Sequence, residues 1–165
     1  MIKALVVCIG NNLVADDGVG HAVYSALAKR LPANTRLKLL GLGGMTLIGE
    51  FRGEELLIVV DAVQLGAYPG TVHVLDWDKL PPGGAAVSCH GIGIREALEV
   101  SQKLYPEVTP KIVHLVGIEG SCFDRLEESL SEEVEAAVKT AAAAVLRLLA
   151  RIRESADTPA VNQSE

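Results

Sequence analysis

The chain has 165 residues and a mass of 17.4 kDa, which predicts one domain with a sizeable hydrophobic core. Its 15 basic and 21 acidic residues give a net charge of −6, which argues against a nucleic-acid-binding surface. Apolar residues make up 49% of the sequence, too many for a disordered chain, and no apolar run approaches the roughly 18 residues of a membrane span. We therefore expect a globular protein without a nucleic-acid or membrane partner.

About five strands are predicted from the apolar pattern. Three continuous apolar runs, at 2–9, 55–63 and 111–118, are rich in Val, Ile and Leu. Continuous rather than alternating hydrophobicity is typical of strands covered on both faces, as in parallel sheets. A weaker strand is expected at about 36–41, and the mixed polarity of 71–77 indicates an edge strand.

Helices are predicted between these strands, where apolar residues recur at helical spacing. With approximate ends, the predicted helices are Asp17–Leu31, Thr46–Phe51, Gly91–Tyr105 and Ser131–Arg153. This alternation predicts a three-layer α/β fold, in which helices flank a twisted, mostly parallel sheet. We expect one domain over residues 1–153 and a flexible tail over 154–165, which has no periodic pattern.

The first strand and the cysteines bear on the cellular compartment. The apolar run 2–9 is followed at once by Gly10, Asn11 and Asn12, without the apolar segment and cleavage site of a signal peptide. We therefore expect a cytoplasmic location. The cysteines are odd in number and lack CxxC spacing, which predicts free thiols rather than disulfides or a structural zinc site. They are Cys8, Cys89 and Cys122.

Acidic side chains and one histidine lie where this fold class builds its ligand sites, beyond the carboxyl ends of the strands. Asp16 and Asp17 precede the first helix, Asp61 ends the second long apolar run, and His90 stands where a loop meets a helix. Each has a purely structural alternative. Asp16 is a candidate helix N-cap, Asp61 a candidate turn residue, and a single histidine is more often structural than catalytic.

The convergence of three such residues favours a functional site. Asp17, Asp61 and His90 would supply two carboxylates and one imidazole. Such a set can hold a divalent ion while leaving other coordination positions open. Open positions suit a metal that is shared with another molecule.

Two other chemistries compete with this interpretation. The glycines spell neither GxGxxG after the first strand nor GxxxxGK[ST], so nucleotide binding is weakly indicated. Cys89 beside His90 suggests a thiol hydrolase, but adjacent residues rarely point toward each other. The remaining histidines, His21, His73 and His114, are predicted to be structural or surface residues. The acidic run 124–135 is predicted to be a solvated helix face.

Several motifs occur together in a characteristic order. They are Gly10-Asn11, Leu13, Asp16-Asp17-Gly18-Val19-Gly20, the glycine-rich segment Gly41 to Ile48, Val60-Asp61-Ala62 and Ser88-Cys89-His90. In order and spacing they resemble the hydrogenase maturation endopeptidases, which process the large subunit of [NiFe] hydrogenases. The resemblance extends over about residues 2–150. Leu42 stands where relatives commonly carry Thr, and Cys89 where another small residue or proline is common.

The resemblance implies a fold, a reaction and a site. In this family an acid of the first motif, an aspartate after a later strand and a histidine contact the metal, and they correspond here to Asp17, Asp61 and His90. The implied reaction is removal of a C-terminal extension from a [NiFe] hydrogenase large-subunit precursor after nickel insertion. The implied cofactor is nickel carried by the precursor rather than permanently bound. The three residues then serve both the metal and catalysis, in a protein that we expect to be a monomer.

Two functions of other classes stay open on the sequence. A nickel-binding or precursor-binding maturation chaperone on the same scaffold would use the same three residues without hydrolysis, and detection of a cleaved product separates it from a protease. A small-nucleotide binder would be stabilised by nucleotides and indifferent to replacement of His90.

Overall fold

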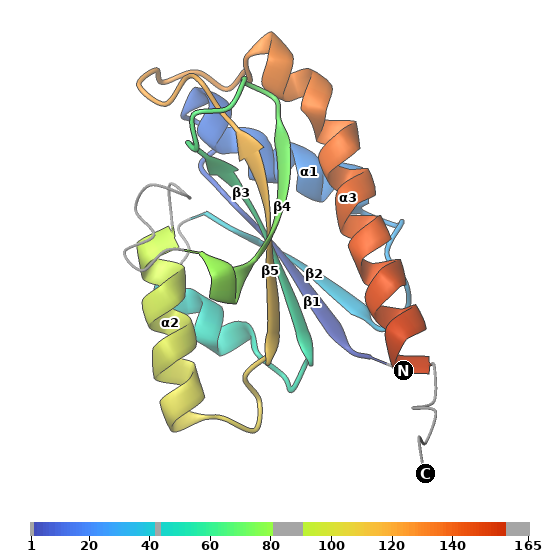
Figure 1. The fold of residues 1–165 in the computed structure, drawn as a ribbon. Coiled ribbons are helices and arrows are strands. Elements are labelled where there is room, and N and C mark those ends of the chain that lie inside the picture. The colour runs from blue at the N-terminus through green and yellow to red at the C-terminus, as the bar shows by residue number, and fades with distance from the viewer. Residues whose placement is uncertain (1, 42–43, 81–90, 158–165) are drawn as a thin grey trace.

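The computed structural model describes residues 2–41, 44–80 and 91–157. One mixed sheet has the strand order β2-β1-β3-β5-β4, with β4 antiparallel to β5 and the other neighbours parallel (Figure 1). The strands are β1 Ala4–Ile9, β2 Thr35–Leu40, β3 Leu56–Val63, β4 Val72–Asp76 and β5 Ile112–Glu119. The predicted mostly parallel α/β fold is confirmed.

Helices cover both faces of this sheet. Figure 1 shows α1 and α3 on one face and α2 with a 3₁₀ helix, η2, on the other. The helices are α1 Val19–Leu27, α2 Gly91–Leu104 and α3 Glu132–Asp157, and the 3₁₀ helices are η1 Ala15–Gly18, η2 Gly44–Glu50 and η3 Trp77–Lys79. None of the helices in the described part of the chain combines the length and apolarity needed to cross a membrane.

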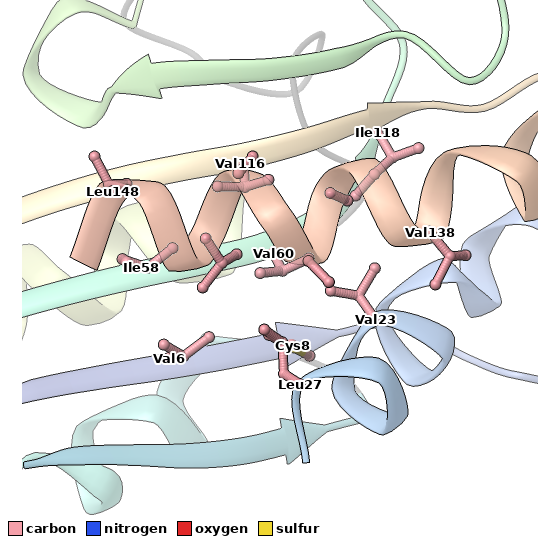
Figure 2. Close-up of a cluster of buried hydrophobic side chains, with 14 of the residues drawn as sticks. Val6, Cys8, Val23, Leu27, Ile58, Val60, Val116, Ile118, Val138 and Leu148 are labelled. Atoms are coloured by element: carbon pink, nitrogen blue, oxygen red, sulfur yellow. The ribbon is translucent and has the colours of Figure 1, made fainter. Parts of the chain in front are cut away.

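The central strands are buried because they pack on both faces. Along β1, Val6 and Cys8 pack against α1 and α3, whereas Leu5 and Val7 pack toward α2 and η2. Figure 2 shows the first of these clusters, in which side chains of β1, β3 and β5 meet those of α1 and α3. Full burial of one such aliphatic side chain stabilises the fold by about 1.5–3 kcal/mol. The continuous apolar runs of the sequence therefore correspond to double-sided burial.

Several element ends differ from the sequence prediction. The first helix was expected over Asp17–Leu31, but the chain forms η1 first, and α1 ends at Leu27 because Ala28 has an extended ψ of 130°. The last helix continues four residues beyond the predicted Arg153, to Asp157. The short helix η3 was not predicted. Residues 158–165, in the predicted tail, lie outside the described residues.

Candidate functional site

The loop after β1 folds back tightly on the end of that strand. Gly10 has φ +150°, and a Cβ at this position would lie 2.0 Å from the carbonyl oxygen of Asp17. A Cβ on Gly20 would lie 2.0 Å from the carbonyl oxygen of Ile9. Only glycine permits such close approaches of backbone to backbone. These two glycines therefore bring η1 and the first turn of α1 against the carboxyl end of β1.

Asp17 is held at this end of the sheet by the loop itself. It lies in η1 and is 8% exposed. The backbone N–H of Asn11 donates a hydrogen bond to its Oδ2 at 3.0 Å. Because η1 contacts β3, the helix that carries Asp17 packs on the strand that carries Asp61.

Asp61 is a fully buried carboxylate within β3. It is 0% exposed, pairs in register with Gly117 of β5, and accepts a hydrogen bond from the backbone N–H of Ala62 at 2.8 Å. The strand continues to Val63, so the alternative that Asp61 begins a turn is wrong. A central parallel strand leaves this acid near the carboxyl end of the sheet, where the fold class places ligands.

The third predicted residue, His90, lies outside the described residues, as do its neighbour Cys89 and Leu42. Within the described ranges, no group of three or more His, Cys, Asp or Glu side chains is arranged to hold a metal ion. The structure thus brings Asp17 and Asp61 to one end of the sheet and does not test the place of His90.

Asp16 has a role that the sequence did not predict. It is 0% exposed, and its carboxylate accepts hydrogen bonds from the backbone N–H groups of Ser121, Cys122 and Ser131 at 2.8–2.9 Å. The hydroxyls of both serines donate to it as well, at 3.3 and 3.1 Å. No side-chain cap occurs on η1 or α1, so the N-cap interpretation is wrong. Asp16 instead joins the loop after β1 to the loop after β5.

The electrostatics of Asp16 follow from these bonds. Burial alone would raise the pKa of Asp16, but the N–H groups of Ser131, Ser121 and Cys122 favour the charged carboxylate and hold its pKa below the ordinary value. Its partners are more than 100 positions away in the sequence. No local pattern could have revealed them.

Glu119 and His21 make further polar contacts at this end of the sheet. The N–H groups of Leu65 and Gly66 each donate to Glu119 Oε1 at 2.8 Å, and His73 Nε2 lies 3.1 Å from Oε2. His21 Nε2 lies 3.1 Å from the carbonyl oxygen of Gly10. These contacts agree with the prediction that His21 and His73 are structural.

The two described cysteines differ in burial. Cys8 is fully buried, and burial raises the pKa of its thiol far above the ordinary value. Cys122 is half-buried, and its Sγ lies 3.7 Å from Asp124 Oδ1. Both are free, as predicted. Burial of this kind makes Cys8 a structural rather than a nucleophilic thiol.

A pocket lies at the opposite end of the sheet from Asp17. It has a volume of about 520 Å³, and Arg95 lies over the ring of Trp77 on its wall, 5.7 Å from the ring centroid. A pocket of about 290 Å³ lies beside the loop after β1 and is lined by Gly10, Asn11, Asn12, His21 and Gly41. The larger of these two pockets is not lined by Asp17 or Asp61, so pocket size alone would not have identified the predicted site.

Comparison with known proteins decides the family. A family model described as hydrogenase maturation protease (HycI) matches residues 22–148. This chain belongs to the hydrogenase maturation protease family. The chain is 31% identical over 153 residues to the hydrogenase expression/formation protein HupD of Thiocapsa roseopersicina, covering 90% of this chain and 68% of that protein. It is 30% identical to the hydrogenase 2 maturation protease of Escherichia coli, covering 93% of each.

A solved maturation protease has the same fold. The [NiFe] hydrogenase maturation protease HybD from Thermococcus kodakarensis superposes with a TM-score of 0.77 at 26% identity, covering 89% of this chain and 99% of that one. The family resemblance found in the motifs is therefore confirmed, together with the fold it implied.

Proposed function

We propose that this protein removes a C-terminal extension from the large-subunit precursor of a [NiFe] hydrogenase after nickel has been inserted. In this proposal Asp17, Asp61 and His90 contact the nickel that the precursor already holds. The observation that carries it is the placement of two buried carboxylates, Asp17 and Asp61, at the carboxyl end of neighbouring strands in a maturation protease.

The donor chemistry supports a cation at this position. Asp17 and Asp61 each accept a backbone hydrogen bond, from Asn11 and from Ala62, so their burial does not by itself require a metal. Asp17 and Asp61 are each almost completely buried, so a divalent ion brought by the substrate would interact with both in a medium of low dielectric. Carboxylates and a neutral imidazole are ordinary ligands of nickel.

Because the metal arrives with the substrate, cleavage depends on whether the precursor carries nickel. A precursor without nickel would present the same peptide but no cation, so the two carboxylates would gain nothing from its docking. Recognition and quality control are then one event. The nickel belongs to the substrate, and the protein contributes the ligands that sense it.

The proposed residues also have the chemistry for proton transfer. Asp17 and Asp61 can each accept a proton from water, and the imidazole of His90 can accept or donate one near neutral pH. An aspartate and histidine site of this kind is the enzymatic part of the proposal. A non-hydrolytic nickel or precursor chaperone would use the same residues only for binding.

Intact-mass spectrometry of the purified precursor tests this function. Nickel-loaded and nickel-free precursor are incubated with the wild-type protein or with His90→Ala, with circular dichroism to confirm folding. We expect loss of a C-terminal peptide only from the loaded precursor with the wild type. Nickel-dependent binding without a change of mass would support the chaperone, and cleavage by the His90→Ala variant at the wild-type rate would remove His90 from the site.

A cytoplasmic location and a monomeric state complete the proposal. Cell fractionation and sedimentation velocity test them directly.

A further inference from the structure

Two leucines are exposed beside the proposed site. Leu126, in the loop between β5 and α3, is 89% exposed, and Leu13, in the loop between β1 and η1, is 52% exposed. Single exposed apolar side chains are common on protein surfaces and need no explanation. These two are notable because the backbone holds them next to each other.

The two loops pair like a short piece of parallel sheet. Val14 and Glu127 form a parallel bridge, the N–H of Glu127 donates to the carbonyl of Leu13 at 3.0 Å, and the N–H of Ala15 donates to the carbonyl of Glu127 at 2.7 Å. Leu13 and Leu126 each precede a residue of this single bridge, so their backbones lie close together.

This leucine pair is held in place before any partner arrives. The carboxylate of Asp16 accepts hydrogen bonds from Ser121 and Ser131, near the two ends of the loop that carries Leu126. A surface that is already ordered loses less conformational entropy on binding than a flexible one. The bonds to Asp16 therefore prepare the leucine pair for docking.

The pair is continuous with the proposed site. The side chain of Asn11 accepts a hydrogen bond from the N–H of Leu13 at 3.0 Å, while the N–H of Asn11 donates to Asp17. Figure 1 shows the loop after β5 and the loop between β3 and β4 gathered at the same end of the sheet. Tyr68, in the loop between β3 and β4, is 87% exposed.

The charge of these loops indicates the kind of partner. Of the five acidic residues in segments 10–18, 64–71 and 120–131, Asp16 and Asp17 are buried and three are exposed, against one basic residue, Arg125. In the loop after β5, Asp124, Glu127 and Glu128 are exposed around Leu126. Complementary charge steers association and suppresses wrong partners. A matching partner segment is basic with an apolar side chain between its charges.

We propose that Leu13 and Leu126, with the surrounding acidic side chains, form the docking surface for the large-subunit precursor, and that they bind a segment in which an apolar residue is flanked by Lys or Arg. This inference rests on the proposed function and adds a contact outside the metal-sensing residues. The surface raises affinity for the precursor and leaves the cleavage step unchanged.

A binding titration tests the docking surface without depending on cleavage. The nickel-loaded large-subunit precursor of the same organism is titrated against the wild type, Leu126→Ser and a control, Leu104→Ser. Leu104 is 63% exposed at the end of α2, at the opposite end of the sheet. We expect Leu126→Ser to raise Kd about tenfold or more, because it removes one buried aliphatic contact, and Leu104→Ser to leave Kd unchanged.

Processing kinetics and sedimentation complete the test. For Leu126→Ser we expect a higher KM at an unchanged kcat, and for the wild type a Kd that rises with salt. Equal Kd values for the wild type and Leu126→Ser would overturn the proposed docking surface. An equal loss of affinity in Leu126→Ser and Leu104→Ser would overturn it as well. A dimer that Leu126→Ser dissociates would assign the surface to a second copy and overturn it too. Tight binding without cleavage by the wild type would instead refute the proposed protease function.

Discussion

Buried carboxylates occur at both ends of the sheet, and the protein stabilises them differently. At the amino end, Glu54 is 4% exposed and forms an ion pair with Arg36, whose guanidinium also lies 3.2 Å from a carboxylate oxygen of Glu50. At the carboxyl end, Asp16 is fully buried and accepts its hydrogen bonds from backbone N–H groups and serine hydroxyls. At the amino end the guanidinium of Arg36 neutralises the carboxylate of Glu54. At the carboxyl end the donors around Asp16 carry no full positive charge, so its negative charge remains.

The pKa values reflect this difference. Burial alone would raise the pKa of Glu54, but the N–H of Arg52 and the hydrogen bond and charge of Arg36 lower it. For Asp16 the lowering comes from N–H and hydroxyl donors that bring no full positive charge. An end of the sheet that keeps its negative charge is suited to a cation or a basic partner. The comparison therefore distinguishes an end where a cationic side chain pairs with the buried carboxylate from an end where uncharged donors surround it.

The largest effect is expected from Asp61→Asn, which keeps the shape of the side chain and removes its charge. The amide oxygen can still accept the hydrogen bond from Ala62, so the fold should persist. We expect processing of the nickel-loaded precursor to fall about a hundredfold or more, as for loss of a general acid or base. Glu99→Gln, an exposed acid on α2, is the matched control. Full activity of the Asp61 variant would exclude this residue from the site.

Asp16→Asn tests the hydrogen-bonded carboxylate at the carboxyl end of the sheet. The amide group cannot accept from all of the donors around it, so we expect the free energy of unfolding to fall by about 2–4 kcal/mol. Urea denaturation followed by circular dichroism measures this change. An unchanged midpoint would show that the two loops are joined without Asp16.

The pH dependence of the unfolding free energy tests the same difference between the two ends of the sheet. Because the pKa of Asp16 is lower in the folded state than its unfolded value of about 3.9, its stabilisation is fully present above about pH 4. It is lost as the pH falls through the folded-state pKa. The difference in unfolding free energy between wild type and Asp16→Asn should therefore be constant from pH 7 to 5 and shrink below pH 4. A pH-independent difference would contradict the lowered pKa.

A smaller effect is expected at the amino end from Arg36→Met. The change leaves the buried carboxylate of Glu54 without its guanidinium partner. Because Arg36 is 35% exposed and water screens the pair, we expect a loss of about 1–2 kcal/mol in stability. The double variant Arg36→Met, Glu54→Gln should recover part of it. Precursor processing by the folded enzyme should be unchanged, and a loss of processing would make this end functional too.

The smallest effect is expected from His21→Ala. His21 Nε2 contacts the carbonyl of Gly10 beside the proposed site, and loss of one such hydrogen bond costs about 0.5–1.5 kcal/mol of stability. Nickel-dependent processing should persist at close to the wild-type rate, whereas His90→Ala should abolish it. If the two histidine variants behave in the opposite way, His21 replaces His90 as the imidazole of the site.

Sequence patterns predicted the fold and the end of the sheet at which Asp17 and Asp61 lie, because both depend on local information. Double-sided burial requires uninterrupted apolar residues, which is why β3 could be identified from its composition. The close backbone approach at Gly20 was not predicted and is visible only in the structure. The end of α1 at Leu27 was missed because helix ends depend on a few weak local preferences.

The sequence by itself therefore determined the α/β class, the mostly parallel sheet and the placement of Asp17 and Asp61 near the carboxyl ends of buried strands. Only the tertiary structure decided the role of Asp16, the contact of Glu119 with His73 and the pairing of Leu13 with Leu126. The physical reason is the sequence separation between the residues in contact. Periodicity records which side of an element is buried, but hydrogen bonds between loops depend on which strand ends the sheet order brings together.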